Sequence, residues 1–304
     1  MASGSKHSYI RKKKFNFKKD MIGWAIMLPG LVLFTFFVWK PLLSGIILSF
    51  FETEGFHAGK FIGFGNYIEA LTDMNFKKAL LNCFKYTFWT LLLTYLLPPF
   101  MAIIINEMVH FRGYFRFSIY FPSMVPSVAV SILWLFLFDP GPNGFLNILL
   151  SYLNIEPSGW LQNPKLTIPL IVLTMAWRNF GPTSVIYIAA LQGINNDLYG
   201  VAAIDGAGFL AKIRHITLPG IYNIMRLFLA VQVIVVFQVL QEPLVLTGGG
   251  PDNASTSLML QIYHFAFRDF QAGKAIATSV IAFIILMSLT LVYFKLVKAN
   301  TDME

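Results

Sequence analysis

Six apolar stretches, each long enough to cross a lipid bilayer, constrain this chain more than any other feature. A transmembrane helix needs about 20 mostly apolar residues, because the hydrocarbon core of a bilayer is about 30 Å thick. The stretches cover residues 21–43, 84–106, 117–138, 166–191, 224–246 and 275–296. The last of them carries no charged residue between Ala275 and Phe294. We therefore predict an all-α, polytopic membrane protein with six transmembrane helices.

The composition supports lipid as the solvent of this chain. Hydrophobic residues make up 56% of the sequence and charged residues only 12%, whereas roughly a quarter of the residues in soluble domains are charged. The single cysteine, Cys83, excludes an internal disulfide. The five histidines are scattered, and none pairs with another at ligand spacing, so we expect no metal site.

The distribution of lysine and arginine predicts the orientation in the membrane. Seven basic residues precede the first apolar stretch: Lys6, Arg11, Lys12, Lys13, Lys14, Lys18 and Lys19. Such a basic flank is typical of a cytoplasmic end at an anionic inner leaflet. We expect both termini in the cytoplasm, external loops at 44–83, 139–165 and 247–274, and internal loops at 107–116 and 192–223. A cleaved signal peptide is the alternative for the first stretch, but no convincing small-residue cleavage site follows it.

This orientation gives a simple domain organisation. A basic cytoplasmic tail covers residues 1–20, a six-span domain covers 21–298, and a short cytoplasmic tail covers 299–304. Much of the net charge of +8 sits in the first tail. We expect contact with membrane lipid and no binding of nucleic acid, because no recognition module for nucleic acid is present.

The internal loop 192–223 has the pattern of a helix-turn-helix. Asn195, Asn196 and Asp197 are residues that favour a helix N-cap. Leu198, Val201, Ala202 and Ile204 form one apolar face of the helix that follows. Asp205-Gly206 ends that helix, with glycine available for a left-handed cap. A second short amphipathic run covers 209–218, before Pro219 opens the next span. We expect the loop to dock a cytoplasmic partner, and an interfacial helix on lipid is the alternative.

The same loop resembles the coupling motif of importer-type ABC permeases. That motif reads Glu-Ala-Ala, three residues, Gly, nine residues, then Ile-x-Leu-Pro. The matching residues here are Ala202, Asp205, Gly206, Ala207, Ile216, Leu218 and Pro219. Gly200 and Val201 stand where the family has its Glu and first Ala, which puts the polar contact made by that Glu in doubt. The resemblance assigns the loop from Asp197 to Pro219 to docking on an ATPase.

Two external segments are similar to the carbohydrate branch of that family, the MalF/LplB-like permeases. They are Gly63-Phe64-Gly65-Asn66-Tyr67 and Thr247-Gly248-Gly249-Gly250-Pro251. The resemblance implies a type I ABC importer fold in the inner (cytoplasmic) membrane of a bacterial cell. It also implies half of a translocation pathway for an oligosaccharide. The chain departs from MalF in having six spans rather than eight, and no large inserted domain in loop 139–165.

The resemblance further implies the partners of the chain. They are a second homologous permease subunit, two cytoplasmic ATPase subunits and an extracellular solute-binding protein that delivers the oligosaccharide. ATP and Mg would bind to the partner subunits, and no cofactor to this chain. The external Thr247–Pro251 segment would shape an external gate or a receptor contact, with a tight turn as the simpler alternative.

Polar residues inside the apolar stretches are candidates for the substrate pathway, because burying polar groups in a membrane is costly. They are Arg178, Asn179, Gln238, Gln241 and Glu242, with the aromatic Phe237 beside them. Amides donate to and accept from sugar hydroxyls, and ring faces cover a pyranose. Gln238 and Gln241 are three residues apart, which predicts one helical face. The alternatives are hydrogen bonds between helices, contacts with the partner permease, and a simple Arg178–Glu242 ion pair.

Nothing in the sequence indicates catalysis by this chain. The three glycines at 248–250 lack the Gly-Lys-Ser/Thr that completes a phosphate-binding loop. No Ser/His/Asp set or paired intramembrane carboxylates are visible, which argues against a membrane-bound enzyme. An ion-coupled secondary transporter is the leading alternative, with Glu242 as its main intramembrane acid, but no internal repeat supports it.

Overall fold

The computed structural model describes residues 17–55 and 57–301, which form two compact units divided after Leu48. In the first unit, α1 (Phe17–Phe34), the π-helical turn η1 (Thr35–Trp39) and α2 (Lys40–Leu48) follow one another without a break. The 28 residues Met21–Leu48 are long and apolar enough to cross a membrane. The predicted first span is therefore confirmed, and the helix continues five residues past its expected end at residue 43. Most of the predicted basic cluster precedes residue 17 and lies outside the described residues.

In the second unit, three further helical stretches of the described residues are long and apolar enough to cross a membrane. They are Met74–Glu107, which contains α4 (Met74–Leu93) and α5 (Leu97–Glu107), Phe209–Phe237 and Ala272–Lys295. The predicted span at 166–191 coincides with α9 (Thr167–Gln192), a helix of 26 residues. This helix is less apolar than the other candidate spans, because it carries Arg178, Asn179 and several hydroxyl side chains.

The predicted span at 117–138 is not one straight helix. α6 (Arg112–Met124) and α7 (Ser127–Leu137) meet at an angle of 96°. The break follows from Pro126, because the ring of a proline disfavours helical backbone at the residue before it. Val125 is accordingly extended, with φ −77° and ψ 135°.

The segment between the first two predicted spans contains structure that the all-α prediction missed. Strands β1 (Phe51–Glu54) and β2 (His57–Phe61) form an antiparallel hairpin, followed by α3 (Gly65–Thr72). The Asn66 amide donates hydrogen bonds of 2.8 Å to the backbone oxygens of Ser49 and Phe51. The Gly63–Tyr67 motif thus helps to hold the hairpin against α3.

Helix α4 begins ten residues before the predicted start of its span at residue 84. Asp73 caps the helix, because its carboxylate accepts hydrogen bonds from the backbone N–H groups of Asn75 and Phe76 at 2.7 and 3.3 Å. The first turns of α4 are polar, which hid them from a search for apolar runs.

Helix α9 runs through the middle of the second unit and packs against α4, α5 and α6. At Gly181 the backbones of α9 and α6 approach so closely that a Cβ atom would lie 1.9 Å from the carbonyl oxygen of Ile119. Buried apolar residues on both sides of this contact form the core. One cluster contains Tyr86, Ile171, Val172 and Val236, and the other contains Ala102, Ile119, Tyr187 and Ile221.

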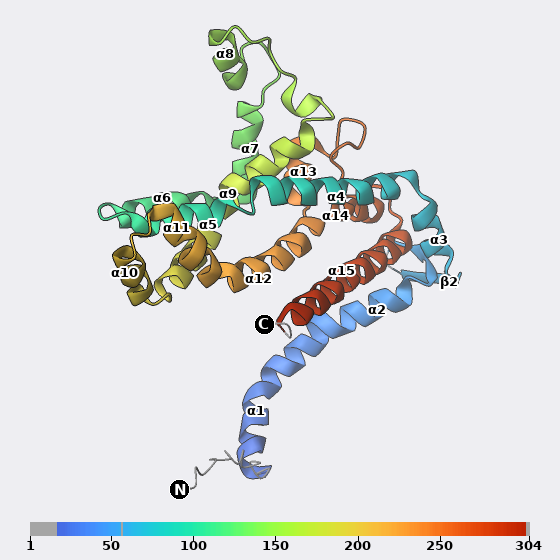
Figure 1. Cartoon of the computed structure of the whole chain (residues 1–304). Coiled ribbons are helices and arrows are strands. Elements are labelled where there is room, and N and C mark those ends of the chain that lie inside the picture. The colour runs from blue at the N-terminus through green and yellow to red at the C-terminus, as the bar shows by residue number, and fades with distance from the viewer. Residues whose placement is uncertain (1–16, 56, 302–304) are drawn as a thin grey trace. The chain divides into compact units, whose positions relative to one another are not determined.

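The loop after α7, predicted to be external, folds into a small projection (Figure 1). It contains α8 (Phe145–Tyr152) and the short 3-10 helix η2 (Trp160–Gln162). The fully buried Asn147 holds it together: its carbonyl oxygen accepts from the Trp160 indole at 2.8 Å and from the Ser158 N–H at 2.9 Å.

The remaining elements connect the two ends of the second unit. They are α10 (Asn196–Ile204), α11 (Phe209–Lys212), the π-helical turn η3 (Ile213–Thr217), α12 (Leu218–Phe237), α13 (Gln241–Thr247), α14 (Leu258–Tyr263), η4 (His264–Arg268) and α15 (Ala272–Thr301). Figure 1 shows α10 and α11 at one end of this unit, and α3 with the hairpin at the other. α12 leads from the first end towards the middle.

Candidate functional site

A cavity of about 560 Å³ lies between α4, α9, α12 and α13. Five of the six residues predicted for the substrate pathway line it: Arg178, Asn179, Gln238, Gln241 and Glu242. Residues that are far apart in the sequence therefore meet at one site. Phe237 is the exception, because its side chain is buried in an apolar cluster with Phe76, Cys83 and Leu258. Its ring packs edge-on against Phe84, so its assignment to the cavity wall is wrong.

The predicted fifth span is broken at the cavity. α12 ends at Phe237 and α13 begins at Gln241, so Gln238 and Gln241 do not share one helical face as predicted. Pro243 explains the break, because its ring clashes with the carbonyl four residues earlier and it has no N–H to donate there. Both glutamines still face the cavity, one from each helix end. Broken helices are tolerated in a membrane where the freed backbone lines a wet cavity.

The backbone carbonyl that loses its helical donor at this break accepts a hydrogen bond from a side chain of another segment. The Ser257 hydroxyl donates a 2.6 Å hydrogen bond to the Val239 carbonyl, and it accepts one from the Leu260 N–H at 3.1 Å. Ser257 is completely buried. A single hydroxyl thus compensates the carbonyl that Pro243 leaves without its helical donor.

We expect Ser257→Ala to destabilise the folded chain by about 1–2 kcal/mol, because a buried carbonyl loses its only donor at the break. Thermal unfolding of the purified chain in detergent measures this loss. Ser151→Ala is the matched control, since the Ser151 hydroxyl bonds only to the local Ile148 carbonyl and is exposed. Equal unfolding temperatures for both variants would contradict the role given to Ser257.

Several polar groups on the cavity wall have no protein partner. The hydroxyls of Thr90 and Thr94 and the Nε atom of Arg178 are buried without a hydrogen bond. Sequence reasoning missed the two threonines, although they are four residues apart, with Thr90 in the last turn of α4 and Thr94 directly after the helix. Buried polar groups without partners are costly. This wall therefore suits water or a ligand rich in hydroxyl groups.

The two charged residues of the cavity do not form the simple ion pair that was one alternative. Arg178 and Glu242 are absent from the ion pairs within 4.0 Å among the described residues. Glu242 is 9% exposed and is the second residue of α13. The N-terminus of a helix carries partial positive charge, so the start of α13 favours this carboxylate.

The Thr247–Pro251 segment forms a tight turn at the end of α13. Gly248 and Gly249 adopt φ values of +58° and +92°, which favour glycine. A Cβ atom at Gly249 would also lie 2.4 Å from the Thr256 hydroxyl. These observations support the tight-turn alternative, and the role as a gate stays a prediction.

The chain after this turn folds back onto α4. The Asn82 amide donates to the carbonyls of Asn253 and Thr256 at 2.9 and 3.1 Å. The Tyr86 hydroxyl donates to the Ser255 carbonyl at 2.9 Å. Sequence reasoning did not single out Asn82 or Tyr86. Their side chains bind the segment 253–256 to α4, the helix that also lines the cavity.

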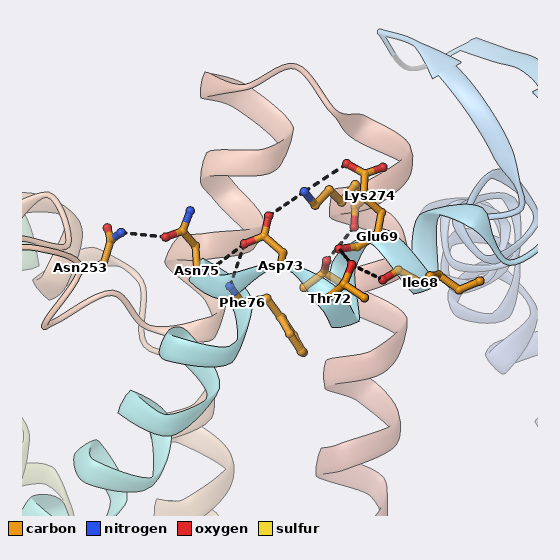
Figure 2. A network of polar contacts seen from close by, with 9 residues as sticks. Ile68, Glu69, Thr72, Asp73, Asn75, Phe76, Asn253 and Lys274 are labelled. Atoms are coloured by element: carbon orange, nitrogen blue, oxygen red, sulfur yellow. Dashed lines mark hydrogen bonds and ion pairs between the residues drawn. The ribbon is translucent and has the colours of Figure 1, made fainter.

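A charged network lies at the start of α4 and α15 (Figure 2). The Lys274 ammonium lies 2.8 Å from the Asp73 carboxylate and 3.2 Å from that of Glu69. It also lies 4.3 Å from the centre of the Phe265 ring. The Lys274 side chain is only 8% exposed. The network therefore joins α3, α4, η4 and α15 around one buried cation.

The helix predicted after Asn195 is present as α10, and its role in coupling stays a prediction. The Asn195 side chain accepts a 3.0 Å hydrogen bond from the Asp197 N–H, and Gly206 follows the helix with φ +77°. The large apolar residues Leu198, Val201 and Ile204 are all exposed. At Gly200 an added Cβ would meet nothing within 4 Å, so the position leaves room for the Glu of the motif.

The second half of that loop differs from its prediction. α12 begins at Leu218 with Pro219 in its first turn, as predicted, but α11 and η3 precede it without a break, so one helical stretch runs from Phe209 to Phe237. The widened π-helical turn Ile213–Thr217 precedes α12, and the Leu218 N–H bonds to the Ile213 carbonyl five residues back. Pro219 is accommodated two residues after this widened turn, in the first turn of α12.

Comparison with known proteins agrees with this geometry. Residues 95–300 match the family model "Binding-protein-dependent transport system inner membrane component". The trehalose/maltose transport system permease protein MalF of Thermococcus litoralis is 29% identical over 95% of this chain and 98% of its own length. The lactose transport system permease protein LacF of Rhizobium radiobacter is 30% identical over 92% of this chain and 95% of its own length.

A solved structure shows the same fold. It is that of a bacterial ABC transporter involved in the import of the acidic polysaccharide alginate, with a TM-score of 0.79 and 25% identity. The alignment covers 91% of this chain and 96% of the matched chain.

Proposed function

We propose, from the premise that the chain belongs to the family of binding-protein-dependent transport system inner membrane components, that its cavity is half of a carbohydrate pathway. The chain is a membrane-embedded permease subunit of an ABC importer and is not itself catalytic. The observation that carries the proposal is the cavity wall, where amides, unpaired hydroxyls and Arg178 meet at a broken helix. The matched relatives named for trehalose/maltose and lactose transport support a carbohydrate substrate.

The transported sugar would be an oligosaccharide that an extracellular solute-binding protein delivers. A second homologous permease subunit would supply the other half of the pathway, and two cytoplasmic ATPase subunits would bind ATP and Mg. The exposed apolar face of α10 supports the ATPase docking. Both termini would lie in the cytoplasm of a bacterial cell, as the basic N-terminal segment favours. Movement of α10 would then drive alternating access.

Copurification tests the assembly. Expressed with its cotranscribed partners, the chain should be isolated with a second permease and an ATPase. Its transport should require ATP and the binding protein. A chain that is a stable, active transporter by itself would contradict the proposal. Uptake that needs an ion gradient and continues without ATP would favour an ion-coupled transporter instead.

We expect Gln238→Leu to lower uptake about five- to tenfold, because a sugar hydroxyl loses one hydrogen-bond partner worth about 1 kcal/mol in the pathway. The measurement is ATP-driven uptake of radiolabelled maltose, trehalose and lactose by proteoliposomes that contain the complete importer and its binding protein. Gln162→Leu is the matched control, since this glutamine is exposed in η2 and does not line the cavity. Equal uptake by both variants would remove Gln238 from the pathway.

A further inference from the structure

Helix α10 is attached to the rest of the second unit over a small area. None of its side chains is buried. A polar cavity of about 700 Å³ lies between α10, the ends of α5 and α9, and the α11–η3 segment, with Asn196 and Tyr199 on one side and Asn106 and Gln192 on another. α10 therefore packs only loosely against the surrounding helices.

A hydrogen bond crosses from α10 to the helix that leads to the pathway. The Tyr199 hydroxyl lies 3.0 Å from the Thr217 hydroxyl in η3. Thr217 is buried, with 6% of its surface exposed. The bond therefore links an element without buried side chains to a buried group in the Phe209–Phe237 helix.

Either hydroxyl can be the donor in this bond. The Thr217 hydroxyl donates to the Lys212 carbonyl at 3.4 Å, across the π-helical turn. A hydroxyl has one hydrogen to donate. When Thr217 donates to Lys212, its oxygen can accept from the Tyr199 hydroxyl, so the tyrosine contacts a side chain that also bonds across the widened turn. Short π-helical turns occur frequently at functional sites.

We propose that the Tyr199–Thr217 hydrogen bond transmits movement of α10 to the Phe209–Phe237 helix. The two side chains are positioning residues for coupling. The proposal rests on the proposed function, because it takes α10 to be the element that the ATPase subunits move. Without the bond, α10 shifts over the polar cavity and less of its movement reaches the pathway.

The test uses the complete importer in lipid nanodiscs and proteoliposomes, with its binding protein and the sugar that it transports. We expect Tyr199→Phe and Thr217→Val to keep both ATPase subunits bound, while uptake per ATP hydrolysed falls about fivefold. Thr217→Ser retains the hydroxyl and should keep the wild-type ratio. The double variant should be no worse than either single variant, because both remove the same bond. Tyr114→Phe is the control, since this exposed tyrosine on α6 has no hydrogen bond among the described residues.

The possible failures are distinguishable. A wild-type chain that captures no ATPase would overturn the proposed function, and with it the coupling role of the Tyr199–Thr217 hydrogen bond. If the wild-type chain transports and the ratio of uptake to ATP hydrolysed is unchanged in Tyr199→Phe and Thr217→Val, only the coupling role of the hydrogen bond is overturned. Loss of the ATPase subunits from both variants would also overturn it, because the bond would then maintain the docking surface rather than transmit its movement.

Discussion

Gly181→Ala is expected to prevent most of the chain from accumulating as folded protein. The added Cβ would lie 1.9 Å from the Ile119 carbonyl oxygen, 2.5 Å from its carbonyl carbon and 2.9 Å from the Tyr120 Cα atom. These are backbone atoms of α6, which cannot turn aside as the end of a flexible side chain can. Relief requires α6 and α9 to move apart, and overpacking of this kind costs about 3 kcal/mol or more.

The measurement is the yield of monodisperse chain on size-exclusion chromatography in mild detergent, together with its thermal unfolding. Gly113→Ala is the matched control, because Gly113 lies on α6 itself and a Cβ there would meet nothing within 4 Å. We expect this control to fold as well as the wild type. A Gly181→Ala chain with normal yield and unfolding temperature would show that the two helices are not in backbone contact.

Lys274→Met should destabilise the end of the second unit that contains α3 and the hairpin by about 2 kcal/mol, because the Asp73 carboxylate would lose its buried cationic partner. The Asp73 side chain is 18% exposed, so water compensates this loss only in part, whereas that of Glu69 is 57% exposed and loses little. Methionine retains the apolar packing of the lysine stem. Thermal unfolding measures the difference, with Lys77→Met, on the exposed side of α4, as the control. Equal unfolding temperatures for the two variants would contradict the prediction.

The same network predicts a dependence on pH. Burial raises the pKa of Asp73 more than any one other influence, but the hydrogen bonds from Lys274 and from the N–H groups of Asn75 and Phe76 together hold the pKa below its ordinary value of 3.8. The pKa of the folded state is thus below that of the unfolded state. The stabilisation from the ionised Asp73 carboxylate is fully present at pH values well above 3.8 and is lost as the pH falls through the folded-state pKa. The difference in stability between wild type and Lys274→Met should therefore shrink on acidification from pH 7 to pH 3, and a constant difference would contradict this.

Features that depend on nearby residues could be predicted from the sequence. The start of α10 at Asn195 and its end near Gly206 follow from side-chain and backbone preferences within a few positions. The membrane-spanning segments likewise follow from continuous apolar composition. Arg178 and the polar residues of 238–242 could be assigned to one site, because buried polar side chains in a membrane have few other uses.

Features that depend on distant residues could not be predicted. Pro243 was visible in the sequence, but a full break at Gln238 also needs the Ser257 hydroxyl, which lies 18 residues after the carbonyl that it satisfies. The early start of α4 depends in part on Lys274, which is 201 residues from Asp73. The β-hairpin is held by Asn66 from 15 and 17 residues away. Local patterns carry no signal for such pairs.

The continuous helix from Phe209 to Phe237 also sets the scale of any motion that passes through it. Its 29 residues span about 44 Å at 1.5 Å per residue, which is longer than the hydrocarbon core of a bilayer is thick. A rigid rod of that length, tilted by about 10° about one end, carries its other end through about 8 Å, more than the 5.4 Å pitch of a helix. Under the proposed coupling, a small rotation near Phe209 would thus become a displacement of several ångströms at the Phe237 end, next to Gln238.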